Sequence, residues 1–302
     1  MSTIEKAMQR LRTGESPPSK PATPSKPPPA ERPPPEEHAR PADTPLPVHE
    51  TVMQQPTVQL DLHRLRRMGI YPPVSMEKPL RDQYRRIKRP LLAGATGRGA
   101  AGVERGNLIM VTSAVAGEGK TFTTLNLALS MARDPDITIT LVDGDVSRAH
   151  ITRMLGVAER PGLLDLLADE SLAAGEVILP TSVDSLSLLP AGRQHALSEE
   201  LLSSERMERV VNALADPTRR HILLFDSAPL LASPEAVTLS QNVGQILLVV
   251  KASSTLRHQV TAAMDTLDPN KAIQLLLNQS LGGLGTDDYY GSYYGDAADG
   301  AR

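Results

Sequence analysis

Residues 108–121 read LIMVTSAVAGEGKT, a short apolar run followed by a glycine-rich loop and a Gly-Lys-Thr triplet. The next residues place Leu125, Leu129 and Ala132 on one helical face, which predicts a strand, a loop and the start of a helix. The glycines let backbone N–H groups approach phosphate oxygens, and a helix N-terminus adds positive potential. The stretch therefore predicts a phosphate-binding loop over 113–121.

Two side chains of this loop have distinct expected tasks. Lys120 can reach the β- and γ-phosphates of a nucleotide, and the Thr121 hydroxyl can bind Mg²⁺. Position 114, where the usual GxxxxGK[ST] pattern has its first glycine, is alanine. A chance Gly-Lys-Thr in a turn is the alternative, which the strand–loop–helix context disfavours. The expected ATP-binding residues of the loop are Ala116, Gly117, Glu118, Gly119, Lys120, Thr121 and Phe122.

Short apolar runs alternate with helix-length segments from residue 107 onward. This alternation predicts an α/β fold with a mostly parallel, doubly wound sheet, in which ligands bind beyond the carboxyl ends of the strands. The expected strands are residues 108–113, 137–143, 185–190, 221–226, 245–250 and 272–278.

Carboxylates stand at two of these strand ends. Asp143 ends the run at 137–143, Asp145 follows it by two residues, and Asp226 ends HILLFD. Helix capping and Asx turns are the plain alternatives for such residues. With the glycine loop nearby, we expect Thr121, Asp143 and Asp226 to bind Mg²⁺.

Composition excludes several classes of function. The chain has 302 residues, a formal net charge of −3 and no cysteine, which excludes disulfides, thiolate metal sites and a cysteine nucleophile. The charge balance argues against a globally basic nucleic-acid binder. Neither a secretory signal nor an apolar run long enough to span a bilayer is found, so we expect a cytoplasmic protein.

Composition also divides the chain. Residues 1–12 have the spacing of a short helix, and residues 13 to about 56, with 14 of the 26 prolines, predict a disordered tether. The whole linker is expected to extend over 13–75, followed by a catalytic domain over 76–278. Residues 279–302, rich in Gly, Asp and Tyr, predict a mobile tail.

An amphipathic helix is expected over 76–92. Leu80, Tyr84, Ile87 and Leu91 share one face. The opposite face is expected to carry Arg85, Arg86, Lys88 and Arg89, and a solvated basic face is the plain interpretation.

Three motifs together resemble a known family. Lys120-Thr121, Asp143-x-Asp145-x-x-Arg148 and Asp226-x-x-Pro229 are similar to the Walker A, A′ and B motifs of bacterial tyrosine kinases, which share the deviant P-loop fold of ParA and MinD. The resemblance covers about residues 76–278 and includes LLPAG (188–192) and EELLSS (199–204). The opening MSTIEKAMQRLR and the DQYRRIKRPLL stretch resemble tyrosine autokinases of exopolysaccharide loci linked to exosortase systems.

The resemblance implies roles for particular residues. Catalysis is expected of Lys120, Asp143, Asp145 and Asp226, with ATP and Mg²⁺ as cofactors, and adenine contact of Asn278. The family's E-x-x-R-x-x-R motif for ring-like self-association is matched by Asp82, Arg85 and Lys88. The tail tyrosines expected to be autophosphorylated in trans are Tyr289, Tyr290, Tyr293 and Tyr294.

Partners follow from the same resemblance. We expect further copies of this chain, a separate inner-membrane activator of the polysaccharide chain-length type and a protein-tyrosine phosphatase, with no nucleic acid. The protein would lie at the inner membrane through its partner. A MinD- or ParA-like positioning ATPase is the first alternative, although Val115 stands where those proteins have a signature lysine. A regulator that binds nucleotide without turnover is the second.

Overall fold

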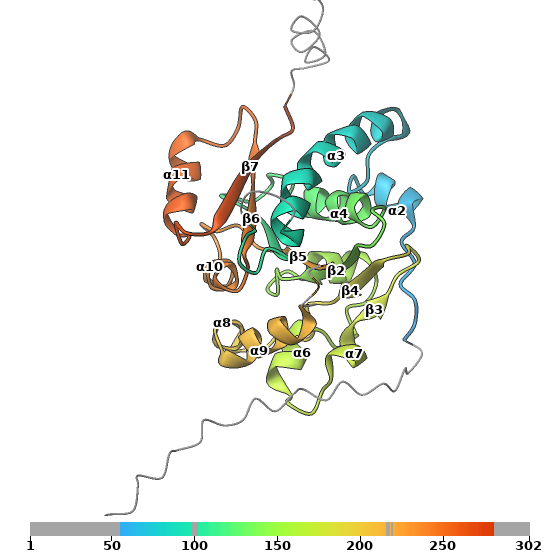
Figure 1. Ribbon diagram of the computed structural model, residues 1–302, viewed down its shortest axis with the longest axis vertical. Coiled ribbons are helices and arrows are strands. Elements are labelled where there is room, and N and C mark those ends of the chain that lie inside the picture. Colours follow the sequence, from blue (N-terminus) through green and yellow to red (C-terminus); the bar gives the residue numbers. More distant parts are fainter. Residues whose placement is uncertain (1–54, 98–101, 216–217, 219, 281–302) are drawn as a thin grey trace, which may run out of the picture. The chain divides into compact units, whose positions relative to one another are not determined.

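The computed structural model describes residues 55–97, 102–215, 218 and 220–280. Within these residues seven strands form one sheet in the order β3-β4-β2-β5-β1-β6-β7 (Figure 1). Every neighbouring pair is parallel except β3 and β4. The mostly parallel sheet predicted from the sequence is therefore confirmed. The strands are β1 (Leu108–Ser113), β2 (Thr138–Asp143), β3 (Leu179–Pro180), β4 (Leu186–Leu189), β5 (His221–Asp226), β6 (Gln245–Lys251) and β7 (Ala272–Asn278).

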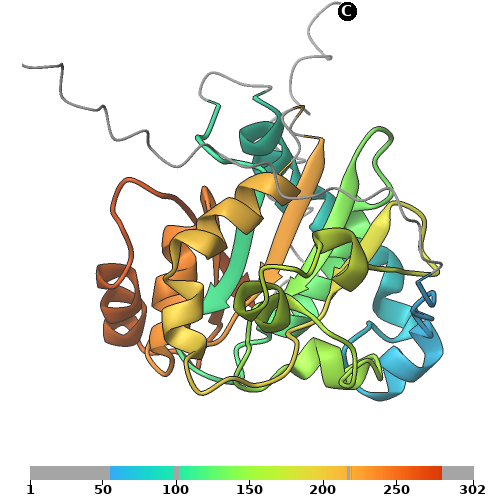
Figure 2. The ribbon, with the colours of Figure 1, turned by 90° about the horizontal axis from the view of Figure 1, so that it is seen from below.

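Helices cover both faces of the sheet, as Figures 1 and 2 show. One face packs against α2 (Leu62–Arg67), α3 (Val74–Thr96), α4 (Lys120–Met131) and α5 (His150–Met154). The other packs against α6 (Leu163–Ala168), α7 (Ala174–Val177), α8 (Ser198–Leu202), α9 (Glu205–Leu214), α10 (Pro234–Gln241) and α11 (Arg257–Asp265).

Strand β1 shows why the central strands have continuous apolar runs. Its residues alternate between the two helical layers: Leu108 and Met110 belong to one apolar cluster, and Ile109 and Val111 to the other. All four have no exposed surface. A strand that is buried on both faces needs apolar side chains at every position, because neither face meets water.

The segment before α3 corrects the predicted linker. Residues 55–73, the N-terminal strap, pack on the α2–α5 face, and Val58 pairs with Thr181 beside β3. Leu65 of α2 is 2% exposed and Tyr71 is 6% exposed. The prediction of a disordered linker over 13–75 is therefore wrong for residues 55–75, because the strap packs on the domain and residues 74–75 begin α3. Residues 1–54, with the predicted short helix and most of the tether, lie outside the described residues.

Helix α3 is longer than expected, and one of its basic residues lies inside. Lys88 follows Tyr84 by one turn, so it shares the buried face instead of the solvated one. Its ammonium nitrogen donates to the Ser130 carbonyl oxygen at 2.7 Å and lies 2.6 Å from Asp134 Oδ2. The predicted basic face therefore lacks Lys88.

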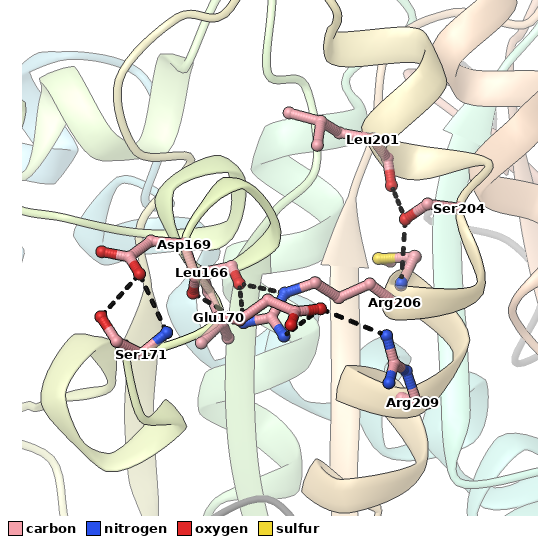
Figure 3. Close-up of polar contacts among 9 residues, drawn as sticks. Leu166, Asp169, Glu170, Ser171, Leu201, Ser204, Arg206 and Arg209 are labelled. Carbon is pink, nitrogen blue, oxygen red and sulfur yellow. Dashed lines mark hydrogen bonds and ion pairs between the residues drawn. The ribbon is translucent and has the colours of Figure 1, made fainter. Parts of the chain in front are cut away.

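A buried arginine joins two helices of the opposite face (Figure 3). Arg206 of α9 donates from Nε and Nη2 to the Leu166 carbonyl at 2.9 and 2.8 Å, and from Nη2 to the Asp169 carbonyl at 2.7 Å. Glu170 lies 3.6 Å from the same guanidinium group. These bonds satisfy carbonyls at the C-terminus of α6, which otherwise have no intrahelical partner.

In the described part of the chain, no helix has the length and apolarity that crossing a membrane requires.

Candidate nucleotide-binding site

The loop between β1 and α4, residues 114–119, is called the phosphate loop below. Gly117 and Gly119 adopt φ of 83° and 92°, a conformation that side chains disfavour. A Cβ on Gly119 would also clash with the Asn278 side-chain amide. Helix α4 begins at Lys120 with no side-chain cap, so the first N–H groups of the helix remain available to an anion.

Ala114 does not disturb this geometry. It is fully buried in the apolar core beneath the loop and is absent from the residues with positive φ. Its backbone conformation therefore has no need of glycine at this position.

Asp226 anchors the start of α4 to the end of β5. Its Oδ2 accepts a hydrogen bond from the Thr121 hydroxyl at 2.8 Å, and its Oδ1 accepts one from the Thr124 hydroxyl at 2.8 Å. The carboxyl group is 1% exposed. Burial, reinforced by the neighbouring carboxyl of Asp143, raises the pKa of Asp226 to about 7.

Asp143 lies directly beside Asp226, as its register partner on the adjacent strand β2. Its Oδ2 accepts from the Thr152 backbone N–H at 2.8 Å and from the Thr152 hydroxyl at 2.7 Å. Its Oδ1 is buried without a hydrogen-bond partner. Burial raises the pKa of Asp143 to about 6, with hydrogen bonds from Thr152 opposing the change.

These groups fit a divalent cation. A buried carboxylate oxygen without a partner, a second buried carboxylate beside it and the Thr121 hydroxyl are hard oxygen donors of the kind that Mg²⁺ prefers. No cluster of three or more potential metal-binding His, Cys, Asp or Glu residues is found among the described residues. This arrangement matches a cation that shares its shell with phosphate oxygens and water.

Lys120 projects into an acidic surrounding. Burial lowers the pKa of its ammonium group, while Asp226, Asp145 and Glu118 oppose the change. Asp145 is 7% exposed and accepts a hydrogen bond at 3.2 Å from the Arg148 backbone N–H. The structure thus brings the predicted residues Lys120, Asp143, Asp145 and Asp226 to one edge of the sheet.

A cavity of about 730 Å³ opens over the phosphate loop. Part of its wall was missed by sequence reasoning, because it comes from the strap and from α3. The side chain of Asn126, in α4, holds this wall by donating to the Ile70 carbonyl at 2.9 Å and to the Phe122 carbonyl at 2.7 Å. No local pattern marks such a contact. The wall residues from the strap and α3 are Gly69, Ile70, Met76, Leu80 and Gln83.

The remaining predicted site residues divide into three groups. Asn278 lines the cavity and donates from Nδ2 to the Glu118 carbonyl at 2.8 Å, so it supports the loop. Asp82 and Arg85 form an exposed ion pair on α3, with 3.8 Å between Asp82 Oδ1 and Arg85 Nη1. Neither residue lines this cavity. The predicted autophosphorylation sites, Tyr289, Tyr290, Tyr293 and Tyr294, lie outside the described residues.

Comparisons with known proteins point in one direction. No protein-family model matches the sequence. The chain is 29% identical over 164 residues to the tyrosine-protein kinase Wzc of Salmonella typhi, covering 54% of this chain and 22% of that protein. It is 30% identical over 152 residues to the tyrosine-protein kinase Ptk of Acinetobacter johnsonii, covering 50% of this chain and 20% of that protein. The matched region thus spans about a fifth of the length of these relatives.

A solved structure agrees over a larger part of the chain. The kinase domain of VpsO superposes with a TM-score of 0.54 at 25% sequence identity, covering 69% of this chain and 100% of that domain. The kinase domain of the Escherichia coli tyrosine kinase Etk shares the fold, with a TM-score of 0.51 and 23% identity.

Proposed function

We propose that this chain is an ATP-dependent protein-tyrosine autokinase, because its sequence and its fold are similar to those of the kinase domains of bacterial tyrosine kinases. Its substrate in this proposal is its own tyrosine cluster, Tyr289, Tyr290, Tyr293 and Tyr294, phosphorylated in trans. The observation that carries the proposal is the convergence of Lys120 with three buried carboxyl groups beside the phosphate loop: Asp145 and Asp226 act on the Lys120 ammonium group, and Asp143 is the register partner of Asp226.

The residues divide the work of phosphoryl transfer. The glycine-shaped loop and the start of α4 bind the phosphates with backbone N–H groups, and Lys120 neutralises charge on the transferred group. Mg²⁺, when bound, offsets negative charge on the phosphate oxygens. Thr121, Asp143 and Asp226 would hold it.

A tyrosine hydroxyl needs an acceptor for its proton, since its ordinary pKa is about 10. Asp145 lines the cavity together with Lys120. Among the hydrogen bonds of the described residues, its carboxylate accepts one, from the Arg148 N–H to Oδ1, so the carboxylate can still accept a bond from a substrate hydroxyl. In this proposal Asp145 orients the hydroxyl and accepts its proton. Asp143 is less suited, because Thr152 already binds one of its oxygens and the other, buried without a partner, is assigned to the cation in this proposal.

The wider biological assignment rests on the family likeness. We propose that autophosphorylation regulates exopolysaccharide polymerisation and export, in the manner of the exosortase-linked subgroup. Each phosphotyrosine adds about −1.5 to −2 charges, which would loosen an assembly of acidic tails. The proposed partners are further copies of this chain, an inner-membrane activator and a tyrosine phosphatase, at the cytoplasmic face of the inner membrane.

The decisive experiment is incubation of the purified chain with γ-labelled ATP and Mg²⁺, followed by mass spectrometric mapping. We expect label on tail tyrosines, lost in Lys120→Met and Asp145→Asn and in a chain ending at residue 278. Matched controls are Lys78→Met and Asp184→Asn, which change exposed residues away from the loop.

The alternatives give different results in the same assay. ATP hydrolysis without protein label would indicate a positioning ATPase of the MinD or ParA type. Binding of ATP without hydrolysis or label, also in the presence of a co-expressed membrane activator, would indicate a nucleotide-binding regulator and would overturn the kinase proposal.

A further inference from the structure

Glu118 has an unexpected orientation for a residue of a phosphate loop. It lies between Gly117 and Gly119, yet its side chain points into the protein and the residue is 1% exposed. Burying a carboxylate costs free energy unless hydrogen bonds compensate. The negative charge of Glu118, close to the bound phosphates, would also oppose nucleotide binding. A favourable contribution of Glu118 must therefore outweigh both the cost of burying its carboxylate and the repulsion of bound phosphates.

Three donors surround the Glu118 carboxylate. Oε2 accepts from the Val115 backbone N–H at 2.8 Å, which closes the loop on itself. Oε1 accepts from the Lys251 backbone N–H at 3.1 Å and from the Thr255 hydroxyl. The carboxylate thus joins the phosphate loop to the end of β6 and to the residues just before α11.

The backbone of the same residue is held from another strand. Its carbonyl oxygen accepts from Asn278 Nδ2 at 2.8 Å, at the end of β7. Glu118 is therefore tied on both sides to the ends of β6 and β7, while its own N–H remains part of the loop that would meet the phosphates.

We propose that Glu118 is a positioning residue that holds the phosphate loop in its nucleotide-receiving shape before nucleotide arrives. Through Thr255, the segment between β6 and α11 then contributes to nucleotide affinity, although it lies outside the phosphate loop. The physical reason is preorganisation: a loop that is already ordered loses less conformational entropy on binding. The inference rests on the proposed function only in requiring that this loop binds a nucleotide.

A glutamine cannot replace this carboxylate. Two of the three neighbours are backbone N–H groups, which only donate, and they approach different oxygens of Glu118. A glutamine amide places an NH₂ group against one of them, so either the Val115 N–H loses its acceptor or the Lys251 N–H keeps only the Thr255 hydroxyl at 3.2 Å. Glu118→Gln therefore keeps the side-chain size and weakens the set of hydrogen bonds from Glu118 to Val115, Lys251 and Thr255, which is called the clamp below.

The charge effect and the clamp predict opposite results. If Glu118 acted only through its charge, Glu118→Gln would strengthen ADP binding and Thr255→Val would change nothing. If Glu118 holds the loop, both variants weaken binding. We expect each to raise the Kd for Mg·ADP about tenfold. The double variant should be weaker by much less than a hundredfold, because both changes break the same contact.

The experiment measures Kd by titration calorimetry for the full chain and these three variants, with Thr261→Val as the control. Thr261 is an exposed residue of α11 whose hydroxyl bonds only the Arg257 carbonyl among the described contacts. Because bound nucleotide itself orders the loop, KM for ATP should rise while kcat at saturating ATP stays near the wild-type value. Tighter binding by Glu118→Gln, or an unchanged Kd in Thr255→Val, overturns the proposal.

Hydrogen exchange separates this inference from the proposed function. In the nucleotide-free protein, the amides of Val115 and Lys251 should exchange faster in Glu118→Gln than in wild type. If wild type binds no nucleotide, the proposed function fails, and the exchange rates still decide whether the clamp exists. Unchanged exchange at both amides would refute it. Thr255→Val supplies a second variant if Glu118→Gln does not fold.

Discussion

Asp143 and Asp226 are register partners on the adjacent parallel strands β2 and β5, with exposed fractions of 0% and 1%. Two carboxyl groups so placed repel each other when both are ionised, and water cannot screen them. The arrangement is unfavourable for the isolated fold and favourable for a site that receives a cation. The carboxyl pair thus destabilises the folded chain at the position where the proposed phosphoryl transfer needs ligands for a cation.

This pair predicts a pH dependence of stability. Both pKa values are raised in the folded protein, to about 6 for Asp143 and about 7 for Asp226, so the folded state holds protons that the unfolded chain releases from about pH 4 upward. Their contribution to the free energy of unfolding therefore falls between pH 4 and 7 and levels off above. We expect Asp226→Asn to raise this free energy by about 2 kcal/mol at pH 8 and little at pH 4. Urea unfolding without Mg²⁺ at both pH values tests this.

The control for that measurement is Asp184→Asn, an exposed carboxyl on a loop. It should leave the stability at both pH values unchanged. Addition of Mg²⁺ and ADP should stabilise the wild type more than Asp226→Asn, because the variant has lost a cation ligand. Equal stabilisation of the two proteins would argue against Asp226 as a ligand.

The N-terminal strap should contribute to folding. Leu65 is 2% exposed within the α2–α5 layer, whereas Met68, three residues later, is 45% exposed. We expect Leu65→Ala to lower the free energy of unfolding by about 2–4 kcal/mol and Met68→Ala by less than about 0.5 kcal/mol. Urea denaturation measures both. Equal, small effects would mean that the strap is not packed in solution.

Lys88 should act within one chain. Lys88→Met breaks its contacts with Asp134 and the Ser130 carbonyl, and we expect a loss of about 1–3 kcal/mol in the free energy of unfolding. Arg85→Ala, on the exposed side of α3, should change stability by less than about 0.5 kcal/mol and weaken any self-association that uses this helix. Denaturation and sedimentation velocity separate the two. A Lys88→Met protein of normal stability that no longer self-associates would instead place Lys88 in an interface.

Nucleotide binding should not depend on whether residue 114 is alanine or glycine. Because its φ is not positive and its methyl group is buried in the core, Ala114→Gly is expected to leave the Kd for nucleotide unchanged. It should lower the free energy of unfolding by about 1 kcal/mol, through the greater freedom of glycine in the unfolded chain. A marked gain in affinity would show that alanine distorts the loop.

Local pattern predicted the strand ends well and the helix faces less well. The runs at 108–113, 221–226 and 272–278 coincide with β1, β5 and β7. The two-residue strand β3 was missed, because a Leu-Pro pair carries no periodicity. Lys88 was assigned to the wrong face, since residue type suggested solvent while its position along the helix, one turn after Tyr84, placed it inside.

The linker prediction failed for a related reason. Proline content marks residues 17–56, and the prediction extended this character to residue 75. Four apolar side chains of the strap, Val58, Leu60, Leu65 and Tyr71, are buried by the domain instead of by their own segment, and Leu62 and Ile70 pack beside them. Burial against a distant surface leaves no local periodic signal.

The amino-acid order alone was enough to predict a phosphate loop over 113–121 and acidic groups at the carboxyl ends of β2 and β5, because loop shape, helix start and strand period depend on neighbours along the chain. The tertiary structure decided three further features of the site. Asp143 lies beside Asp226, Ile70 forms part of the cavity wall, and Glu118 bonds to Thr255. Those contacts depend on which strands become neighbours in the sheet and which helices cover them. The partners in these contacts are 56 or more positions apart in the sequence, so they meet only after the chain has packed.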